Sequence, residues 1–383
     1  MTVEDSLPIP HLKIAFTFDR KAEWLARGLS EEQCLEFESD TTIEGIASGL
    51  RKYGSVEMVG GLKALAARLT AGSEVDWDLV FNICEGYGVP GREAQVPALL
   101  EAWGLPFTFS DSATLALCID KAKTKMVLEH YAIPTAPFAC VPPRNTTSHL
   151  LEINAALTIA NSPHCESLQN FPLFVKPCAI SSGIGITQAN KVMNSESLQT
   201  VVNDLSIQYP SQPILIERFL DGREFTVGLV GTGSEARVLG VRELVYLKHN
   251  PDQPIDPSVP YDAHDPALLQ LDIYGRELKR SWSPNPQFKD MALDSDPVVK
   301  AVADVALKAW RILGCRDGGR IDIRHDILGV DAIPNVIEVN PIAGLRPNWS
   351  DLPQLAKAHG VNYEGLLGLI ISSAMQRAHL KFI

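Results

Sequence analysis

The sequence predicts an α/β protein whose C-terminal part has α+β character. Its first 115 residues alternate strand-like runs with helical patterns, which is the signature of a small parallel sheet with crossover helices. Farther along, strand-like runs follow one another across short turns, which is typical of antiparallel pairing. A chain of 383 residues is also too long for a single hydrophobic core, so two or three domains are expected.

The N-terminal pattern consists of short apolar strands and amphipathic helices in alternation. Glycine ends each of these helices, as C-terminal caps often do. Strands are expected at 13–18, 55–60, 78–83 and 105–110, and helices at 42–54, 61–72 and 94–104.

The rest of the chain begins with a helix at 121–134, which the Ile133-Pro134 step ends. Residues 141–170 are polar and proline-rich around a helical run at 148–160, as in an insertion or a domain edge. The segment 249–297 has no apolar periodicity that would assign it, and long loops of this kind are usually functional. The remaining expected elements are strands at 171–177 and 213–220, a helix at 195–208, a hairpin across Gly231 to Gly233, and a helix at 297–314.

Composition excludes several classes of partner. The chain has 34 basic and 46 acidic residues, a formal charge of -12, and no Lys/Arg-rich run to follow a phosphate backbone, so neither nucleic acid nor an anionic membrane is expected. No signal peptide and no apolar run of membrane-spanning length is found. The 7 cysteines are scattered without a CxxC pair, which favours reduced thiols and a cytoplasmic location.

Two charged strand-like runs near the C-terminal end suggest a metal site. In "NVIEVN" Glu338 and Asn340 project from one face of a strand, and in "GRIDIR" Arg320 and Asp322 do the same. If the strands pair antiparallel, the four groups could converge. Oxygen ligands without His or Cys describe a site for Mg²⁺ or Mn²⁺. The alternative is an ordinary amphipathic hairpin with its charges in solvent.

Two further stretches suggest a nucleotide. In "VKPCAISSGIGI" Lys176 precedes a Ser/Gly-rich loop whose backbone N–H groups could approach phosphates, although a plain turn explains the same residues. In "ILIERFLDGREFTV" Glu217 and Glu224 flank a connecting strand that could meet an adenine and a ribose. A surface turn at Asp221-Gly222 is the alternative.

The order of these motifs resembles an ATP-grasp enzyme. More narrowly, "CIDKAKTKMVLEHYAIPTAPF", "FPLFVKP", "LIERFLDGREFTVG", "GRIDIR" and "IEVNPIAGL" resemble the D-alanine–D-alanine ligase family from about residue 78 to about residue 370. The resemblance implies a three-domain ATP-grasp architecture. Its parts would be a Rossmann-like N-terminal domain at 1–116, a central lid domain at 117–216, and a C-terminal domain at 217–383 with the metal and catalytic site.

The resemblance also implies roles for individual residues. ATP would be held by Lys121, Lys176, Ser181, Ser182, Gly183, Glu217, Arg218, Phe219, Leu220 and Glu224. Two Mg²⁺ ions, or Mn²⁺ in their place, would be held by Asp322, Glu338 and Asn340. The catalytic groups would be Arg320, the backbone N–H of Gly344, and Ser182.

The sequence departs from the family pattern around the amino-acid substrates. The family's "EHEVSL" stretch is missing, and Glu38 is a positional substitute for its Glu. Glu85 stands where the family has a His, and Lys248 would replace a missing "AKY" lysine. Arg346 is an added cation near the acceptor site, where it could hold a carboxylate or lie at the surface. The pocket for the first substrate is therefore expected to have changed.

The function expected from the resemblance is an ATP-dependent ligase that joins a carboxylate to an amine through an acyl phosphate and releases ADP and phosphate. The substrates would be amino acids or amino-acid-like small molecules, and a homodimer is an option that the family leaves open. The alternatives are D-alanine–D-alanine ligase itself, an amino-acid ligase of mycosporine-type natural-product synthesis, and a nucleotide-binding module without catalysis. A hydride-transferring enzyme is disfavoured because no GxGxxG follows the first strand.

Overall fold

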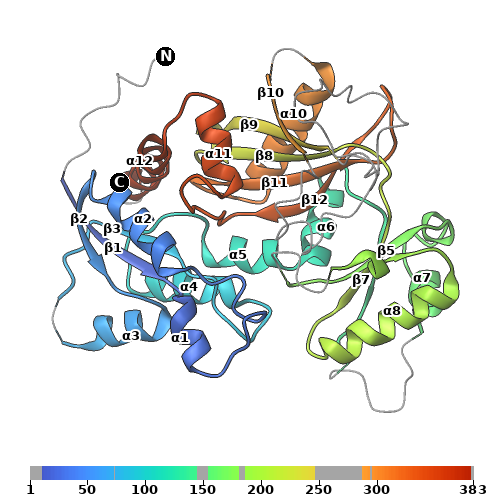
Figure 1. Ribbon diagram of the computed structural model, residues 1–383, viewed down its shortest axis with the longest axis horizontal. Coiled ribbons are helices and arrows are strands. Elements are labelled where there is room, and N and C mark those ends of the chain that lie inside the picture. The colour runs from blue at the N-terminus through green and yellow to red at the C-terminus, as the bar shows by residue number, and fades with distance from the viewer. Residues whose placement is uncertain are drawn as a thin grey trace, which may run out of the picture.

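The computed structural model contains three β-sheets joined along one chain (Figure 1). It describes residues 11–72, 74–144, 154–180, 186–245, 287–293 and 296–380. The first sheet is parallel and the other two are antiparallel. This arrangement confirms the predicted α/β class with α+β character toward the C-terminus.

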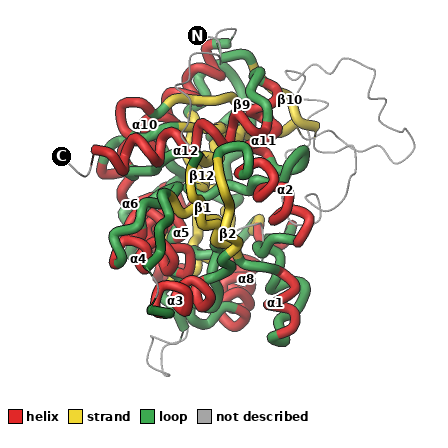
Figure 2. Tube along the Cα trace, turned by 90° about the vertical axis from the view of Figure 1, so that its left-hand side faces the viewer, coloured by secondary structure: helices red, strands yellow, loops and turns green. Residues whose placement is uncertain are grey.

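The N-terminal sheet has the strand order β2-β1-β3. Its strands are β1 (Leu12–Phe18), β2 (Gly54–Met58) and β3 (Leu79–Ile83). Ile14 and Phe16 of β1 face helix α2 (Asp40–Leu50), whereas Ala15 faces α3 (Leu62–Thr70) and α4 (Gln95–Ala102). Both faces are thus covered by helices, as Figure 2 shows around the strands, and this explains why the strands are almost continuously apolar.

The prediction of a strand at 105–110 was wrong. Within this segment the structure has one isolated parallel bridge, between Phe107 and Val80 of β3. Phe109 has a φ of 70°, which an extended strand does not allow, so the run turns away after a single pairing.

Two consecutive helices connect the N-terminal sheet to the rest of the molecule. In α5 (Ser112–Ile119) the Asp111 side chain accepts from Thr114 N, and in α6 (Lys121–His130) the Asp120 side chain accepts from Lys123 N. Asp120 is therefore both the end of α5 and the N-cap of α6. This fixes Lys121 at the first position of α6, which ends at His130, three residues before Ile133.

The central sheet has the order β4-β7-β5-β6. Its strands are β4 (Phe138–Val141), β5 (Leu173–Pro177), β6 (Lys191–Val192) and β7 (Ile214–Arg218). Helices α7 (Ala155–Ala160) and α8 (Ser195–Gln208) pack on one face of this sheet through a shared apolar cluster. Lys176 of β5 and Glu217 of β7 lie on neighbouring strands.

The C-terminal sheet has the order β10-β9-β8-β11-β12. Helix α10 (Pro297–Ile312) covers one face, where Trp310 is fully buried, and α11 (Asp351–Ala358) packs against β8 and β9. The expected hairpin across residues 231–233 is confirmed by the antiparallel pairing of β8 with β9. The strands are β8 (Glu224–Val230), β9 (Arg237–Val245), β10 (Gln287–Met291), β11 (Gly318–His325) and β12 (Pro334–Asn340).

Helix α12 (Tyr363–Leu380) returns to the N-terminal sheet and lies beside α2 (Figure 1). Its Leu366, Leu367 and Ile370 are fully buried in the same cluster as Ile14 and Phe16. Gly49 of α2 allows this close approach, because a Cβ there would lie 2.5 Å from Leu367 Cδ1. The N-terminal core is therefore completed by the other end of the chain.

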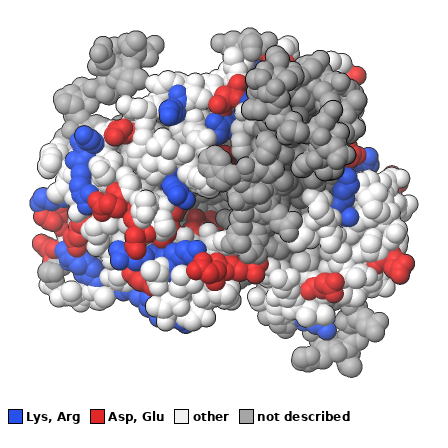
Figure 3. Space-filling view, in the orientation of Figure 1, with Lys and Arg blue, Asp and Glu red and all other residues white. Residues whose placement is uncertain are grey.

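The division at residues 116 and 216 stays a prediction, although each of the three predicted parts contains the larger part of one sheet. Two further helices are α1 (Lys21–Ala26) and the short 3-10 helix η2 (Arg92–Ala94) next to α4. None of the helices in the described ranges combines the length and apolarity that crossing a membrane requires. On the face shown in Figure 3, basic and acidic side chains intermingle over the N-terminal region.

Candidate active site

The β11–β12 hairpin brings the four predicted polar groups together. Arg320 is paired with Asn340 and Asp322 with Glu338, in one antiparallel ladder. Asn340 Nδ2 lies 3.1 Å from Asp322 Oδ2, and Arg320 Nη2 lies 3.4 Å from the same oxygen. The expected convergence on one patch is therefore present. A β-bulge directly after Asp322 ends the regular register of this pairing.

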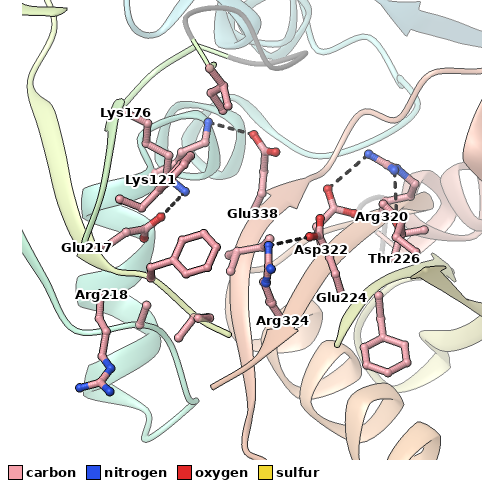
Figure 4. A pocket seen from close by; sticks show the side chains of 18 of the residues that line it. Lys121, Lys176, Glu217, Arg218, Glu224, Thr226, Arg320, Asp322, Arg324 and Glu338 are labelled. Carbon is pink, nitrogen blue, oxygen red and sulfur yellow. Dashed lines mark hydrogen bonds and ion pairs between the residues drawn. The ribbon is translucent and has the colours of Figure 1, made fainter. Parts of the chain in front are cut away.

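Arg320 is held from two further elements. Its Nη1 donates to Thr226 Oγ1 of β8 at 3.2 Å and to Asp351 Oδ2 at the start of α11 at 2.7 Å. With Asp322 as a third partner, the guanidinium has a fixed orientation at the edge of the sheet (Figure 4). Such a fixed charge can stabilise an anion without reorganising.

Lys121 reaches this hairpin from the first turn of α6. Its Nζ lies 2.9 Å from Glu338 Oε1 and donates to the carbonyl of Ile180 at 2.8 Å (Figure 4). Burial would lower the pKa of Lys121, but the Glu338 carboxylate outweighs it and raises the pKa. The side chain is 7% exposed and cationic, so it places a positive charge beside the Glu338 carboxylate.

A second buried charge cluster lies under the central sheet. Glu217 forms an ion pair with Lys176 at 2.6 Å and a second one with Lys125 of α6 at 3.0 Å. Burial would raise the pKa of Glu217, yet the two lysines outweigh it and lower the pKa to about 2. Lys125 also donates to Thr135 Oγ1 at 2.8 Å and to Ala136 O at 3.0 Å, which fixes its position.

Lys121, Lys176, Glu217, Arg320, Asp322 and Glu338 line a cavity between the central and the C-terminal sheet. Apolar walls come from Phe174, Phe219, Leu220 and Leu244, and charged groups stand at its rim. Glu224 is among them, and Arg324 Nη1 donates to it at 3.0 Å from the next strand. A cavity with apolar walls and several charged groups suits a flat base attached to an anionic tail.

A second cavity lies between segments of the N-terminal domain and the β11–β12 hairpin, and it shares three charged residues with the first: Lys121, Arg320 and Glu338. Asn340 lines it from the end of β12, and Gly344, Arg346 and Trp349 line it from the segment between β12 and α11. The N-terminal side is strongly acidic and contributes Glu36, Glu38, Glu85 and Glu93. The two cavities therefore meet at the hairpin.

The predicted site residues are distributed over these two cavities. Those that line the first are Lys121, Lys176, Glu217, Arg218, Phe219, Leu220, Glu224, Arg320, Asp322 and Glu338. Gly344 and Asn340 line the second, as do the substitutes Glu38 and Glu85. Ser181, Ser182, Gly183 and Lys248 lie outside the described residues.

Several residues of the site were not anticipated. Lys125 stands four residues after Lys121, so helical spacing could have placed both on one face. Arg324 continues the alternation of Arg320 and Asp322 along β11. No local signal identifies Asp351 or Glu93, because each acts across a long sequence separation.

The oxygen-rich hairpin fits a magnesium ion only in combination with a phosphate ligand. Among the described residues, no three His, Cys, Asp or Glu side chains form a complete cage, and Asp322 and Glu338 are the carboxylates that face each other across the strands. Mg²⁺ typically binds one or two carboxylates and completes its shell with phosphate oxygens and water. The residues of the hairpin therefore fit Mg²⁺ that is bound together with a phosphate.

The chain has a domain with a parallel sheet, followed by two antiparallel sheets, and lysines and carboxylates line the cavity between those two sheets. This arrangement defines an ATP-grasp ligase. The family model described as "D-ala D-ala ligase C-terminus" matches residues 127–256 and 260–372. The chain belongs to this family of C–N bond-forming ligases.

Relatives agree with this assignment over most of the chain. The D-alanine–D-alanine ligase of Marinomonas sp. (strain MWYL1) is 29% identical over 336 residues, which is 87% of this chain and 89% of the relative. The D-alanine–D-alanine ligase of Xanthomonas axonopodis pv. citri (strain 306) is 27% identical over 332 residues, 86% of this chain and 88% of the relative.

Solved structures show the same fold. The D-alanine–D-alanine ligase of Bacillus anthracis complexed with ATP aligns with a TM-score of 0.67 at 18% identity, covering 97% of this chain and 99% of that chain. The enzyme of Coxiella burnetii aligns with a TM-score of 0.65 at 19% identity, covering 97% and 96%.

Proposed function

We propose that the protein is an ATP-dependent carboxylate–amine ligase that acts on amino acids or amino-acid-like substrates. The single observation that carries the proposal is the junction of the two cavities at Lys121, Arg320 and Glu338. A nucleotide in the first cavity and a carboxylate in the second would meet there. Attack of the carboxylate on the γ-phosphate would give an acyl phosphate and ADP, and an amine would then displace phosphate.

The nucleotide would lie in the first cavity. Its base would lie against Phe219 and Leu220 with Glu217 nearby, and its ribose would meet Glu224. Lys121 and Lys176 would supply positive charge to the phosphates, and Ser181, Ser182 and Gly183 would supply hydrogen-bond donors. The ion pair between Glu217 and Lys176 supports this proposal, since it orients the Lys176 side chain at the cavity wall.

Asp322, Glu338 and Asn340 would hold two Mg²⁺ ions, or Mn²⁺, which when bound would neutralise charge on the phosphates. Arg320 would bind the oxyanion that forms when the amine attacks the acyl phosphate, and the N–H of Gly344 would donate to the same atom. The three contacts of Arg320 support this role, because they hold its charge in place before the reaction. Small molecules are the proposed partners, and the homodimer and cytoplasmic location stay predictions.

D-Alanine–D-alanine ligation is the second candidate because the curated relatives carry that name. Around the second cavity, Glu85 replaces the His expected from the family pattern, and Arg346 is an added cation. These differences favour a changed amino-acid substrate over D-alanine.

The test is to mix the purified protein with ATP, Mg²⁺ and L- and D-amino acids, and to follow ADP, AMP and phosphate. ADP and phosphate formed only with an amino acid present would support the ligase. A strict requirement for D-alanine would select the second candidate. AMP as the product would contradict the acyl-phosphate route, and ATP binding without turnover in every mixture would favour a non-catalytic module.

A further inference from the structure

The second cavity contains more carboxylates than its own cations can match. Glu36 and Glu38 reach it from the segment before α2, Glu85 from the loop after β3, and Glu93 from η2. Three separate segments thus direct acidic side chains into one enclosed space beside the reaction centre. Such convergence costs free energy in the absence of a cation.

Arg92 is the nearest cation, but its hydrogen bonds go elsewhere. Its Nη2 donates to both oxygens of Glu36 at 2.9 Å, and its Nη1 donates to Ala179 O at 3.0 Å. Glu93 Oε1 lies 3.7 Å from Nη2, beyond hydrogen-bond distance. Arg92 therefore neutralises Glu36 and leaves Glu93 without a hydrogen bond among the described residues.

Glu93 and Glu85 receive no hydrogen bond from any described residue, although Glu93 keeps a 3.7 Å ion pair with Arg92. Glu93 is 7% exposed and lines the cavity wall, and Glu85 makes no hydrogen bond or ion pair with any described residue. Burial raises the pKa of Glu93 to about 7, although Arg92 opposes the shift. Burial, and then the charge of Glu93, raises the pKa of Glu85 well above its usual range. A positively charged neighbour would stabilise both carboxyls in their ionised form.

The other cations of the cavity already have partners. Lys21 pairs with Glu31 at 2.6 Å, Lys121 with Glu338, and Arg320 with Asp322 and Asp351. Arg346 remains, stacked on the Trp349 ring at 4.8 Å. This charge could meet the carboxylate of an amino acid, and Glu38 could meet its α-ammonium. Glu85 and Glu93 would still lack a hydrogen-bonded cation, so an amino acid with a neutral side chain does not complete the site.

We propose that the second cavity binds a substrate with a cationic side chain, a diamino or guanidino acid whose side-chain cation lies between Glu85 and Glu93. The proposal rests on the proposed ligase function and names its substrate class. A buried site built to pair with a cation discriminates strongly against an analogue that lacks it, because its carboxyls are then left unpaired.

The test uses matched amino-acid pairs of equal shape. ATP-dependent phosphate release is measured with the L- and D-forms of ornithine against norleucine, of lysine against 2-aminoheptanoic acid, and of arginine against citrulline. We expect kcat/KM to be at least about a hundredfold higher with one of the basic acids than with its neutral partner. Equal turnover of the neutral partner overturns the proposal while leaving the ligase function intact.

Two variants locate the effect. Glu93→Gln and Glu85→Gln keep the shape of the side chain and should remove most of the preference for the basic acid over its neutral partner. Glu44→Gln, at an exposed carboxylate on α2, is the matched control and should change nothing. A preference that survives in both cavity variants overturns the assignment.

A binding measurement covers the case of no turnover. Thermal unfolding is followed with a non-hydrolysable ATP analogue alone, and then with each amino acid added. Stabilisation by ornithine, lysine or arginine in the wild type but not in Glu93→Gln supports the proposal, and its absence with all three overturns it. The shift in unfolding temperature with the analogue alone reports on the nucleotide site. Failure of the proposed ligase function is therefore distinguished from failure of the proposed substrate class.

Discussion

Lys121 Nζ forms an ion pair with Glu338 Oε1 at 2.9 Å, at the boundary that the two cavities share. The lysine thus neutralises a carboxylate that we propose as a metal ligand. A cation that binds Glu338 must compete with this ammonium, unless a phosphate gives Lys121 another partner.

Metal binding should therefore depend on nucleotide. We expect Mn²⁺, used as a spectroscopic substitute for Mg²⁺, to bind at least about tenfold more tightly when an ATP analogue is present, as expected for a typical coupling between two ligands. Lys121→Met should strengthen Mn²⁺ binding without nucleotide and weaken binding of the analogue. The measurement is Mn²⁺ titration by electron paramagnetic resonance. Equal affinity with and without the analogue would contradict the competition.

Asn340→Ala should reduce turnover without unfolding the protein. Asn340 is paired with Arg320 across the hairpin and its side chain contacts Asp322, so the variant removes an oxygen ligand but buries no new charge. We expect a fall in kcat of about 10- to 100-fold, the range seen when metal sites lose supporting contacts. Initial rates at saturating ATP test this, with thermal unfolding as the control. Unchanged turnover would remove Asn340 from the site.

The two lysines on Glu217 should respond differently to substitution. Lys176 lines the nucleotide cavity, whereas Lys125 is buried beneath it and is bonded to Thr135 and Ala136. Lys176→Met should weaken ATP binding by roughly tenfold or more, the scale of one charge-assisted contact. Lys125→Met should mainly lower the free energy of unfolding, by about 3 to 5 kcal/mol if the loss resembles that of other broken buried pairs. Calorimetric titration with ATP and urea unfolding distinguish them; equal nucleotide affinities in both variants would contradict the division of roles.

His325 should make stability sensitive to pH. Its ring is buried, its Nε2 has no hydrogen-bond partner among the described residues, and burial, aided by Arg223, lowers its pKa from 6.5 to about 4. The folded protein thus holds the ring neutral, and the unfolded chain takes up a proton below pH 6.5. The contribution to stability is complete above pH 6.5 and is lost as the pH falls through about 4. Urea unfolding of the wild type and of His325→Gln between pH 4 and 7 should show a smaller pH dependence in the variant; identical slopes would exclude this source.

The hairpin of Arg320, Asp322, Glu338 and Asn340 could be predicted from the sequence because a period of two residues and a short turn define it. The acidic wall of the second cavity could not be predicted from the sequence. Glu93 and Arg92 precede an apolar helix and resemble solvent-exposed charges, and only tertiary packing buries them. The segment 105–110 was misread for a related reason: its apolar residues pack as a turn, and one positive φ at Phe109 ends the pairing.

The burial of α12 in the N-terminal core has a consequence for biosynthesis. Ile14 and Phe16 are made first in translation, and their neighbours Leu367 and Ile370 follow more than 350 residues later. On the ribosome, part of the apolar surface of the first sheet therefore stays uncovered until α12 emerges. The nascent chain should remain sensitive to proteases and attractive to chaperones over this interval, and an isolated fragment of residues 1–116 should not form a stable domain.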